Sequence, residues 1–339
     1  MNKILIIPPL PWYMSVHAEY LIRHLSDKFF IEVADVPYPP YENFLDRFPE
    51  TNPYQRNPDD YDLLWPILPS HWVVTEKDKY AHKVATVFYQ PNEGRFEDMA
   101  VVGAATPMAS KSLGDFNYWN LHFGIDADLF KPLNFSREDK LLHVGMIGTL
   151  NNPRRFTKPI IEAVGKLPGV RLMLFPTHMF NQHDVDLLGG KQILQYVESG
   201  ELSWPGLVNA YNRLDVLIRC DIDPGYSFPV LEAAACGVPV IATNSGIDHF
   251  ITNQGGGLLI GADETDNNGS GRAWYQSHES ELLWEIVAAV EYLRDNPKDR
   301  KEMGKNGREE IVKNWDWGQF IPVWEEFFQD GINRALKNA

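Results

Sequence analysis

Residues 220–247 read CDIDPGYSFPVLEAAACGVPVIATNSGI, and this stretch decides the fold. The apolar run 216–219 before it predicts a strand, which ends in a loop of Asp, Pro, Gly, Tyr and Ser. A helix over 230–236 follows, because Pro229 lacks an N–H that a first helical position would leave unpaired anyway. The segment 238–242 then predicts another strand. Strand, helix and strand in this order are typical of a parallel sheet covered by helices.

The same alternation extends in both directions from this stretch. The 339 residues of the chain are enough for two domains. We predict an N-terminal Rossmann-like domain over 1–132, a second over 133–315, and a C-terminal helix over 316–339 that packs back on the first. Further strands are expected at 4–7, 30–36, 84–88, 100–103, 142–147 and 170–175, and further helices at 16–25, 157–167, 279–294 and 298–314. Residues 37–60 are rich in Pro, Asn, Asp and Tyr and predict a long loop.

Composition narrows the classes of partner. The chain has 31 Lys and Arg against 46 Asp and Glu, a formal net charge of −15. A protein that binds nucleic acid or an anionic membrane through phosphates usually has a basic face, so both partners are unlikely. Two cysteines, Cys220 and Cys236, lie in apolar stretches and indicate no disulfide framework. No run of about 18 apolar residues predicts a membrane span, and we expect a cytoplasmic protein.

The start of the helix near Pro229 is suited to a phosphate. Free backbone N–H groups and the positive end of the helix dipole point back at the preceding loop. Glu232 lies about one turn inside, where its carboxylate can accept hydrogen bonds from sugar hydroxyls. Asp223 with Gly225 fits simple turn chemistry equally well, and Glu232 on its own also fits a solvated first-turn residue.

These residues resemble the donor-binding signature of family 4 of the retaining glycosyltransferases. That signature is a Glu, seven residues and a second Glu, followed by a run like LEAxACGxPVIA, which 231–242 matches closely. Residues 122–132, HFGIDADLFKP, resemble the hinge peptide of the family, and 293–317 resemble its C-terminal helical segment. The resemblance implies the GT-B fold, an α/β architecture of two Rossmann-like domains facing each other across a cleft, with a C-terminal helix that crosses back to the N-terminal domain.

The resemblance also implies roles for individual residues. Glu232 matches the second Glu and would hold the ribose hydroxyls of a nucleotide. The first Glu falls at Pro224, so Asp223 is the adjacent carboxylate for the donor sugar. Thr149 stands where the family has an Arg that neutralises the leaving diphosphate, and Arg219 would supply that charge. The remaining donor-site candidates are Arg154, Arg155 and Lys158, near the usual Lys, and Gly225, Tyr226, Ser227, Phe228 and Val230, around the helix start.

Each of these basic residues also has a structural interpretation. Arg154, Arg155 and Lys158 fit a solvated cluster, and Arg219 fits a buried structural ion pair. On the acceptor side, the His that the family often has near the reacting sugar is replaced by Phe88. His71 and His82 are the remaining histidine candidates there, and partly buried or loop histidines are the simpler interpretation.

The expected function is transfer of a hexosyl or pentosyl unit from a nucleotide-diphosphate sugar to a hydroxyl acceptor, with retention of anomeric configuration and without a metal. The departures at Pro224, Thr149 and Phe88 favour an alternative, a nucleotide-sugar-binding protein that has lost turnover. A transferase acting on modified nucleic-acid bases is a further alternative, which the charge of −15 disfavours.

Overall fold

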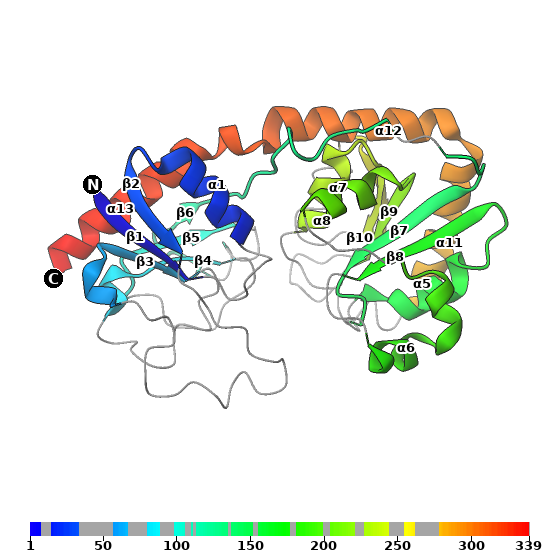
Figure 1. Ribbon diagram of the computed structural model, residues 1–339, viewed down its shortest axis with the longest axis horizontal. Helices are drawn as coiled ribbons and strands as arrows, with labels where there is room; N and C mark the ends of the chain where they lie inside the picture. Colours follow the sequence, from blue (N-terminus) through cyan, green and yellow to red (C-terminus); the bar gives the residue numbers. More distant parts are fainter. Residues whose placement is uncertain are drawn as a thin grey trace. The chain divides into compact units, whose positions relative to one another are not determined.

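The computed structural model forms two compact units, the first of which is assembled from both ends of the chain (Figure 1). Unit 1 comprises Met1–Gly124 and Trp317–Ala339, and unit 2 comprises Ile125–Asp316. The expected boundary between residues 132 and 133 falls inside unit 2. The structure describes residues 1–7, 15–33, 57–66, 80–88, 98–105, 110, 113–134, 137–151, 155–176, 181–198, 204–220, 227–243, 254–261 and 278–338.

Unit 1 contains two three-stranded parallel sheets, ordered β2-β1-β3 and β4-β5-β6. A parallel bridge between Leu64 and Val84 connects them. Apolar side chains of the central strands are buried, as the continuous apolar runs in the sequence predict for parallel strands. The elements are β1 (Asn2–Ile7), α1 (Ser15–Leu25), β2 (Phe29–Val33), η2 (Pro58–Asp60), β3 (Leu63–Pro66), η3 (Ala81–Lys83), β4 (Ala85–Phe88), β5 (Val101–Ala104) and β6 (Trp119–Asn120).

The C-terminal helix α13 (Ile321–Asn338) supplies much of the core of unit 1. Trp324, Phe327 and Phe328 are fully buried, and the Trp324 ring lies 5.0 Å from that of Trp65. The indole Nε1 of Trp324 donates to the carbonyl of His122 at 2.9 Å. The aromatic side chains of α13 therefore form a packing surface within unit 1. A short 3₁₀ turn, η8 (Trp317–Gln319), precedes the helix.

Unit 2 is built on a five-stranded parallel sheet in the order β11-β10-β9-β7-β8. The chain goes from β7 (Leu142–Gly148) outward to β8 (Val170–Pro176), and then returns to the other side of β7. Its strand order therefore reverses between β7 and β9, which is where doubly wound sheets bind ligands. The other strands are β9 (Val216–Arg219), β10 (Val240–Thr243) and β11 (Gly257–Ile260).

Six α-helices and two shorter helical turns surround this sheet in the described part of unit 2. They bury the aliphatic side chains of the sheet in one continuous cluster that includes Val144, Ile160 and Ile286. The helices are α5 (Thr157–Val164), α6 (Gln182–Leu188), α7 (Trp204–Asn212), α8 (Phe228–Ala235), α11 (Glu279–Asp295) and α12 (Pro297–Glu310), with η5 (Lys191–Gln195) and the π-helical turn η7 (Ile311–Trp315), which continues α12.

The α12 helix packs closely on the turn between α8 and β10. A Cβ at Gly304 would lie 2.1 Å from the carbonyl oxygen of Gly237, which itself has φ +74°. Arg308, one turn later, donates to the carbonyl oxygens of Phe130, Ala127 and Ala235 at 2.7 to 2.9 Å. One guanidinium thus joins α12, the end of α8 and the segment at 127–130.

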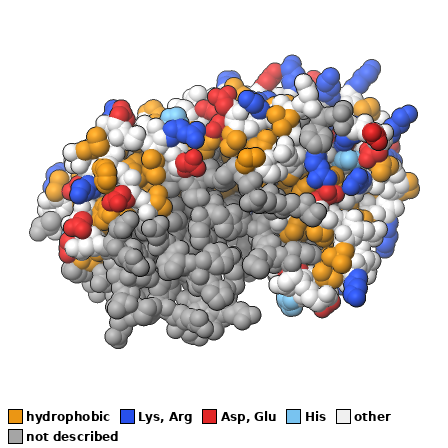
Figure 2. All heavy atoms as spheres, viewed as in Figure 1, with side chains coloured by type: hydrophobic (Ala, Val, Ile, Leu, Met, Phe, Trp, Pro, Cys, Tyr) orange, Lys and Arg blue, Asp and Glu red, His pale blue; other side chains and the backbone are white. Residues whose placement is uncertain are grey.

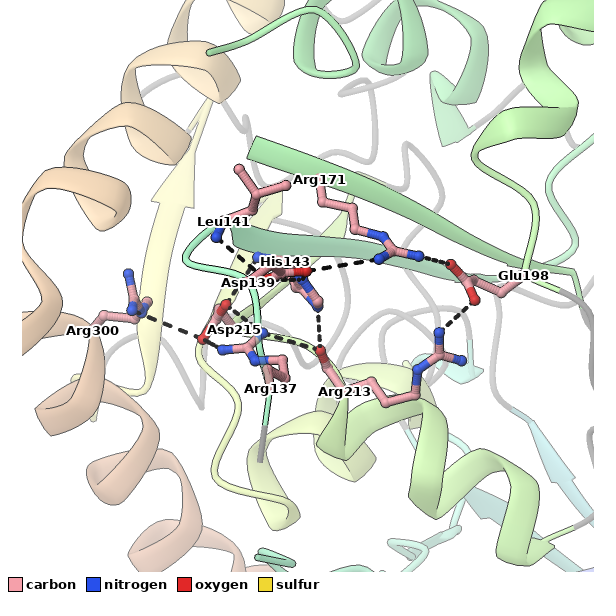
Figure 3. A network of polar contacts seen from close by, with 9 residues as sticks. All are labelled: Arg137, Asp139, Leu141, His143, Arg171, Glu198, Arg213, Asp215 and Arg300. Carbon is pink, nitrogen blue, oxygen red and sulfur yellow. Dashed lines mark hydrogen bonds and ion pairs between the residues drawn. The ribbon is translucent and has the colours of Figure 1, made fainter. Parts of the chain in front are cut away.

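A charged network covers the amino ends of β7, β8 and β9 (Figure 3). Asp215 receives both guanidinium nitrogens of Arg137 at 2.7 and 2.8 Å and the backbone N–H of His143 at 2.9 Å. Burial raises the pKa of Asp215, but these donors and Arg300 outweigh it and lower the pKa below its ordinary value. Glu198 pairs with Arg171 and Arg213 on the same edge. The arginines of this network are therefore paired with carboxylates that lie beside the strands, and we interpret their role as structural.

The surface shows mixed charge. On the face in Figure 2, Lys and Arg side chains alternate with Asp and Glu side chains, without a continuous basic area among the coloured residues. None of the described helices combines the length and the apolarity that crossing a bilayer requires.

Several expected elements agree with the structure and several were missed. Each strand expected before residue 220 is present within a few residues of its predicted ends, and so are the strand of 238–242 and the helices of 16–25, 157–167 and 279–294. The helix expected over 298–314 ends its α-helical part at Glu310. The sequence did not predict β3, β11, α6 or α7. Most of the loop expected over 37–60 lies outside the described residues, and Pro58–Asp60 form a 3₁₀ turn.

Candidate functional site

The candidate site lies at the carboxyl ends of β7 and β9, on the edge of the sheet opposite the charged network. Gly148 is the last residue of β7 and has φ +130°, a conformation that favours glycine. Arg219 is the last residue of β9 and is 92% buried, with 8% of its surface exposed. These strands are neighbours in the sheet, so their final residues lie at the point where the strand order reverses.

Two guanidinium groups meet at Gly148. A Cβ at this residue would lie 2.5 Å from Nη1 of Arg155 and 3.3 Å from Nη1 of Arg219. Arg155 also donates from Nη1 to the carbonyl oxygen of Thr149 at 3.1 Å. Because glycine has no Cβ, both cations approach the backbone here. The structure therefore brings together Arg155 and Arg219, which are 64 positions apart in the sequence.

The amino end of α8 follows β9 and carries four of the predicted donor-site residues. Ser227 is the N-cap, but its hydroxyl makes no capping bond, and the buried Oγ has no hydrogen-bond partner among the described residues. Phe228 and Val230 are buried in the first turn, where the N–H of Val230 donates to the carbonyl of Ser227 at 3.1 Å. A buried hydroxyl without a partner is costly. A ligand with polar oxygens at this helix end would remove that cost.

Glu232 is the fourth predicted residue on α8, and its carboxyl is buried. The hydroxyl of Tyr211 donates to Oε2 at 2.5 Å. Burial raises the pKa of Glu232 to about 7, although the Tyr211 hydrogen bond and the positive charge of Arg219 lower it. This carboxyl therefore changes charge close to neutral pH, and it does so within reach of a buried guanidinium.

Tyr211 is a residue that sequence reasoning missed. It lies in the last turn of α7, fully buried, with its ring edge-on to Phe130 at 6.1 Å between centroids. A buried tyrosine usually needs a partner for its hydroxyl. A buried tyrosine is therefore expected to have a hydrogen-bond partner. The sequence does not show that this partner is Glu232, which follows β9 along the chain.

The other predicted residues are spread more widely. Lys158 lies on α5 with an exposed side chain, and Thr149 is exposed directly after β7. Phe88 is buried in an apolar cluster with Val102 and Leu113, which fits packing. His82 is half-buried in η3. The predictions for Asp223, Pro224, Gly225, Tyr226, Arg154 and His71 fall outside the described residues.

A metal site is not evident in the part of the chain that the structure describes. No three His, Cys, Asp or Glu side chains there gather in an arrangement that would hold an ion. Neither Cys220 nor Cys236 forms a disulfide, and both are buried. Burial, with the nearby Glu232, raises the pKa of Cys236 to about 12, so its thiol stays neutral.

Comparison with known proteins finds similarity to glycosyltransferases. Residues 143–268 match the family described as glycosyl transferases group 1. The sulfoquinovosyl transferase SQD2 of Arabidopsis thaliana is 23% identical over 273 residues, which are 76% of this chain and 46% of that protein. The D-inositol 3-phosphate glycosyltransferase of Paenarthrobacter aurescens is 23% identical over 63% of this chain and 52% of its own. The chain spans about half the length of the curated relatives it matches.

Solved structures agree on the fold. The sucrose-phosphate synthase of Thermosynechococcus elongatus superimposes with a TM-score of 0.70 at 14% identity, over 97% of this chain and 98% of that chain. Anabaena HepE in complex with UDP-glucose gives a TM-score of 0.68 at 15% identity, over all of both chains. The fold is therefore α/β with two Rossmann-like domains, as the sequence predicts. The match to glycosyl transferases group 1 lies within unit 2, and the likeness to the solved structures extends the shared fold over the whole chain.

Proposed function

We propose that the protein transfers a sugar from a nucleotide-diphosphate sugar to a hydroxyl acceptor, with retention of anomeric configuration. The observation that carries the proposal is the meeting of Arg155 and Arg219 at Gly148, on the sheet edge where the strand order reverses. The next described helix along the chain after β9 is α8. Two guanidinium groups and a helix end are donors suited to a diphosphate.

In the proposed reaction, the bond between the anomeric carbon and the diphosphate oxygen breaks, and the diphosphate leaves with the bonding electrons. Negative charge grows on the leaving oxygen in the transition state, so preorganised guanidinium groups stabilise that state more than the bound donor. The acceptor oxygen attacks the anomeric carbon from the face that the diphosphate leaves. Its proton passes to the departing phosphate oxygen, which balances the charge without a separate base.

Glu232 is proposed to accept hydrogen bonds from the ribose hydroxyls of the donor, as its place in the signature implies. Ser227, Phe228 and Val230 are proposed to line the diphosphate, and Asp223 to contact the donor sugar in place of the missing first Glu. Gly225, Tyr226, Arg154 and Lys158 complete the proposed donor site. The proposed compartment is the cytoplasm, and the reaction is proposed to need no metal, so a chelator should leave its rate unchanged.

The test is turnover with a panel of nucleotide sugars, followed by anomeric analysis of the product. Arg155→Met should lower kcat by roughly 100-fold, because it removes a charge that acts mainly on the leaving group. Arg171→Met is the matched control, since Arg171 lies at the amino end of β8, and its kcat should stay within about twofold of the unchanged protein. Inverted product, or unchanged turnover in Arg155→Met, would contradict the mechanism.

A second candidate is a protein that binds nucleotide sugars without turnover. It is favoured by Thr149, which is exposed at the end of β7 where the related enzymes are expected to have an arginine. Thermal stabilisation by a nucleotide sugar without transfer or slow hydrolysis of that donor would select this candidate. Transfer with a retained anomer would remove it.

A further inference from the structure

We propose that Tyr211 is a positioning residue for donor recognition: it holds one oxygen of the Glu232 carboxylate so that the other is presented to the donor. The inference rests on the proposed function, in which Glu232 binds the ribose. Nothing in the donor-binding signature includes Tyr211, which precedes β9. The assignment comes from the contact between the two side chains.

The geometry of that contact is specific. Tyr211 and Glu232 are separated by 21 positions and by all of β9, and the hydroxyl donates to Oε2 at 2.5 Å. Both residues are buried, Tyr211 completely and Glu232 with 7% of its surface exposed. A carboxylate has two acceptor oxygens, and the phenol occupies one of them. Oε1 then remains the acceptor for a ligand hydroxyl.

Tyr211 and its helix are held in place by the segment 130–133 of the chain. Phe130 packs edge-on against its ring, and the neighbouring Asn212 donates to the carbonyl of Lys131 at 3.0 Å. Oδ1 of Asn212 accepts from the backbone N–H of Leu133 at 2.6 Å. Arg308 holds the carbonyl of Phe130 at 2.7 Å. The phenol therefore has one arrangement, which a positioning residue requires.

The charged and titratable groups around the carboxyl define what the contact does. Arg219 faces it from β9, Tyr211 from α7, and Cys236 lies one turn later on α8. A donated hydrogen bond favours the ionised form of a carboxyl, and a carboxylate is the stronger acceptor for sugar hydroxyls. Without the phenol, the carboxyl holds its proton to higher pH and its orientation is lost.

The experiment measures affinity for UDP-glucose and GDP-mannose by calorimetry between about pH 5.5 and about pH 9. The diphosphate diester of such a probe carries the same charge throughout this range. Its uracil or guanine ring begins to lose a proton at the alkaline limit, which affects all variants alike, so differences between the variants come from the protein. Tyr211→Phe keeps the ring and its packing but removes the hydroxyl. Tyr61→Phe is the matched control, because Tyr61 is a buried tyrosine of unit 1 that donates to Glu32 at 2.7 Å.

The unchanged protein should bind more weakly as the pH falls through about 7. Tyr211→Phe should bind roughly tenfold more weakly at neutral pH and recover only part of this loss at the alkaline end, where the carboxyl is ionised but is no longer oriented. Glu232→Gln should bind weakly with no pH dependence, and Tyr61→Phe should follow the unchanged protein. A Tyr211→Phe profile parallel to that of the unchanged protein, whether lowered or not, would overturn the positioning role. Absence of binding by the unchanged protein at every pH would instead contradict the proposed function.

Discussion

At the scale of single residues, Gly148 determines how closely cations approach the end of β7. Its φ of +130° disfavours a side chain, and a Cβ here would lie 2.5 Å from the Nη1 atom of Arg155, which would have to move. Glycine at this position thus permits both the backbone conformation and the close approach of the arginine that is proposed to bind the ligand. A substitution here tests both consequences at once.

Gly148→Ala should lower the stability of the fold by about 1 to 2 kcal/mol through its backbone conformation. It should also weaken nucleotide-sugar binding by roughly tenfold or more, because the methyl group displaces the Arg155 guanidinium. The control is Gly114→Ala, at φ +58° with nothing within 4 Å of its Cβ. Urea unfolding should show a loss in both variants, and calorimetry a loss of affinity in Gly148→Ala alone. Equal affinities of the two variants for the nucleotide sugar would show that Arg155 does not contact the ligand.

Glu232 gives a pH dependence of stability. Its pKa is about 7 in the folded protein against an ordinary 4.5, so the folded state binds the proton more tightly than the unfolded state. The stabilisation is complete below about pH 4.5 and is lost as the pH rises through about 7. Glu232→Gln lacks this loss, so its stability relative to the unchanged protein should increase by up to about 3 kcal/mol over that range. Urea unfolding at a series of pH values measures the difference, and parallel curves would contradict the assignment.

At the scale of elements, α12 rests on the turn that ends α8. Two glycines on this helix differ in the space around them. A Cβ at Gly304 would lie 2.1 Å from the carbonyl oxygen of Gly237, whereas one at Gly307 would lie 3.4 Å from the Cβ of Ala234. The first is a collision with backbone and the second is ordinary contact.

Gly304→Ala should therefore destabilise unit 2 by roughly 2 to 4 kcal/mol, because α12 must move away from the turn. Gly307→Ala is its matched control and should be neutral or more stable by up to about 1 kcal/mol, since alanine favours the helix. Thermal or urea unfolding of the two variants compares them directly. A similar loss in both would show that helix position, rather than backbone contact, decides the outcome.

The elements also show what the sequence can predict. The strands β7, β9 and β10 are buried along their whole length, and their mostly apolar sequences predicted them. The missed strands have breaker residues and few β-branched ones: β3 reads LLWP and ends at Pro66, and β11 reads GLLI and begins at Gly257. The capping box of α6, formed by Asn181 and Asp184, is a sequence signal for the start of that helix.

For the candidate site, the signature located Glu232, and charge arguments suggested Arg155 and Arg219. The two arginines come together at Gly148 because β7 and β9 are neighbours in the sheet. The local sequence does not predict which strands are neighbours. The hydrogen bond between Tyr211 and Glu232 could not be predicted for the same reason, because β9 lies between the two residues in the sequence. Pairings across a sheet are decided by topology, so the structure had to supply them.

At the scale of the molecule, the two units depend on different parts of the chain. The β1 and β3 strands of unit 1 come from the first part, but Trp324 from the last part fills their core and contacts Trp65. Unit 2 is one continuous stretch, Ile125–Asp316. Damage to α13 should therefore affect unit 1 alone.

Trp324→Ala should lower the stability of unit 1 by about 3 to 5 kcal/mol, because it removes a fully buried indole and its hydrogen bond to His122. Hydrogen exchange followed by mass spectrometry should accelerate in β1 and β3 and stay unchanged in β7 and β9. Glu326→Ala, an exposed change on the same helix, should leave both units unchanged. Faster exchange in β7 would show that the units do not unfold separately.

The divided composition of unit 1 sets the order in which a ribosome can complete the protein. All of Ile125–Asp316 is translated before Trp317, so unit 2 has its whole sequence while unit 1 still lacks the helix that fills its core. Multidomain chains generally fold from the amino terminus during synthesis, and here that order is reversed. Until α13 emerges, Trp65 and its apolar neighbours lack their cover, and nascent unit 1 is a natural substrate for a chaperone that shields exposed aromatic surface.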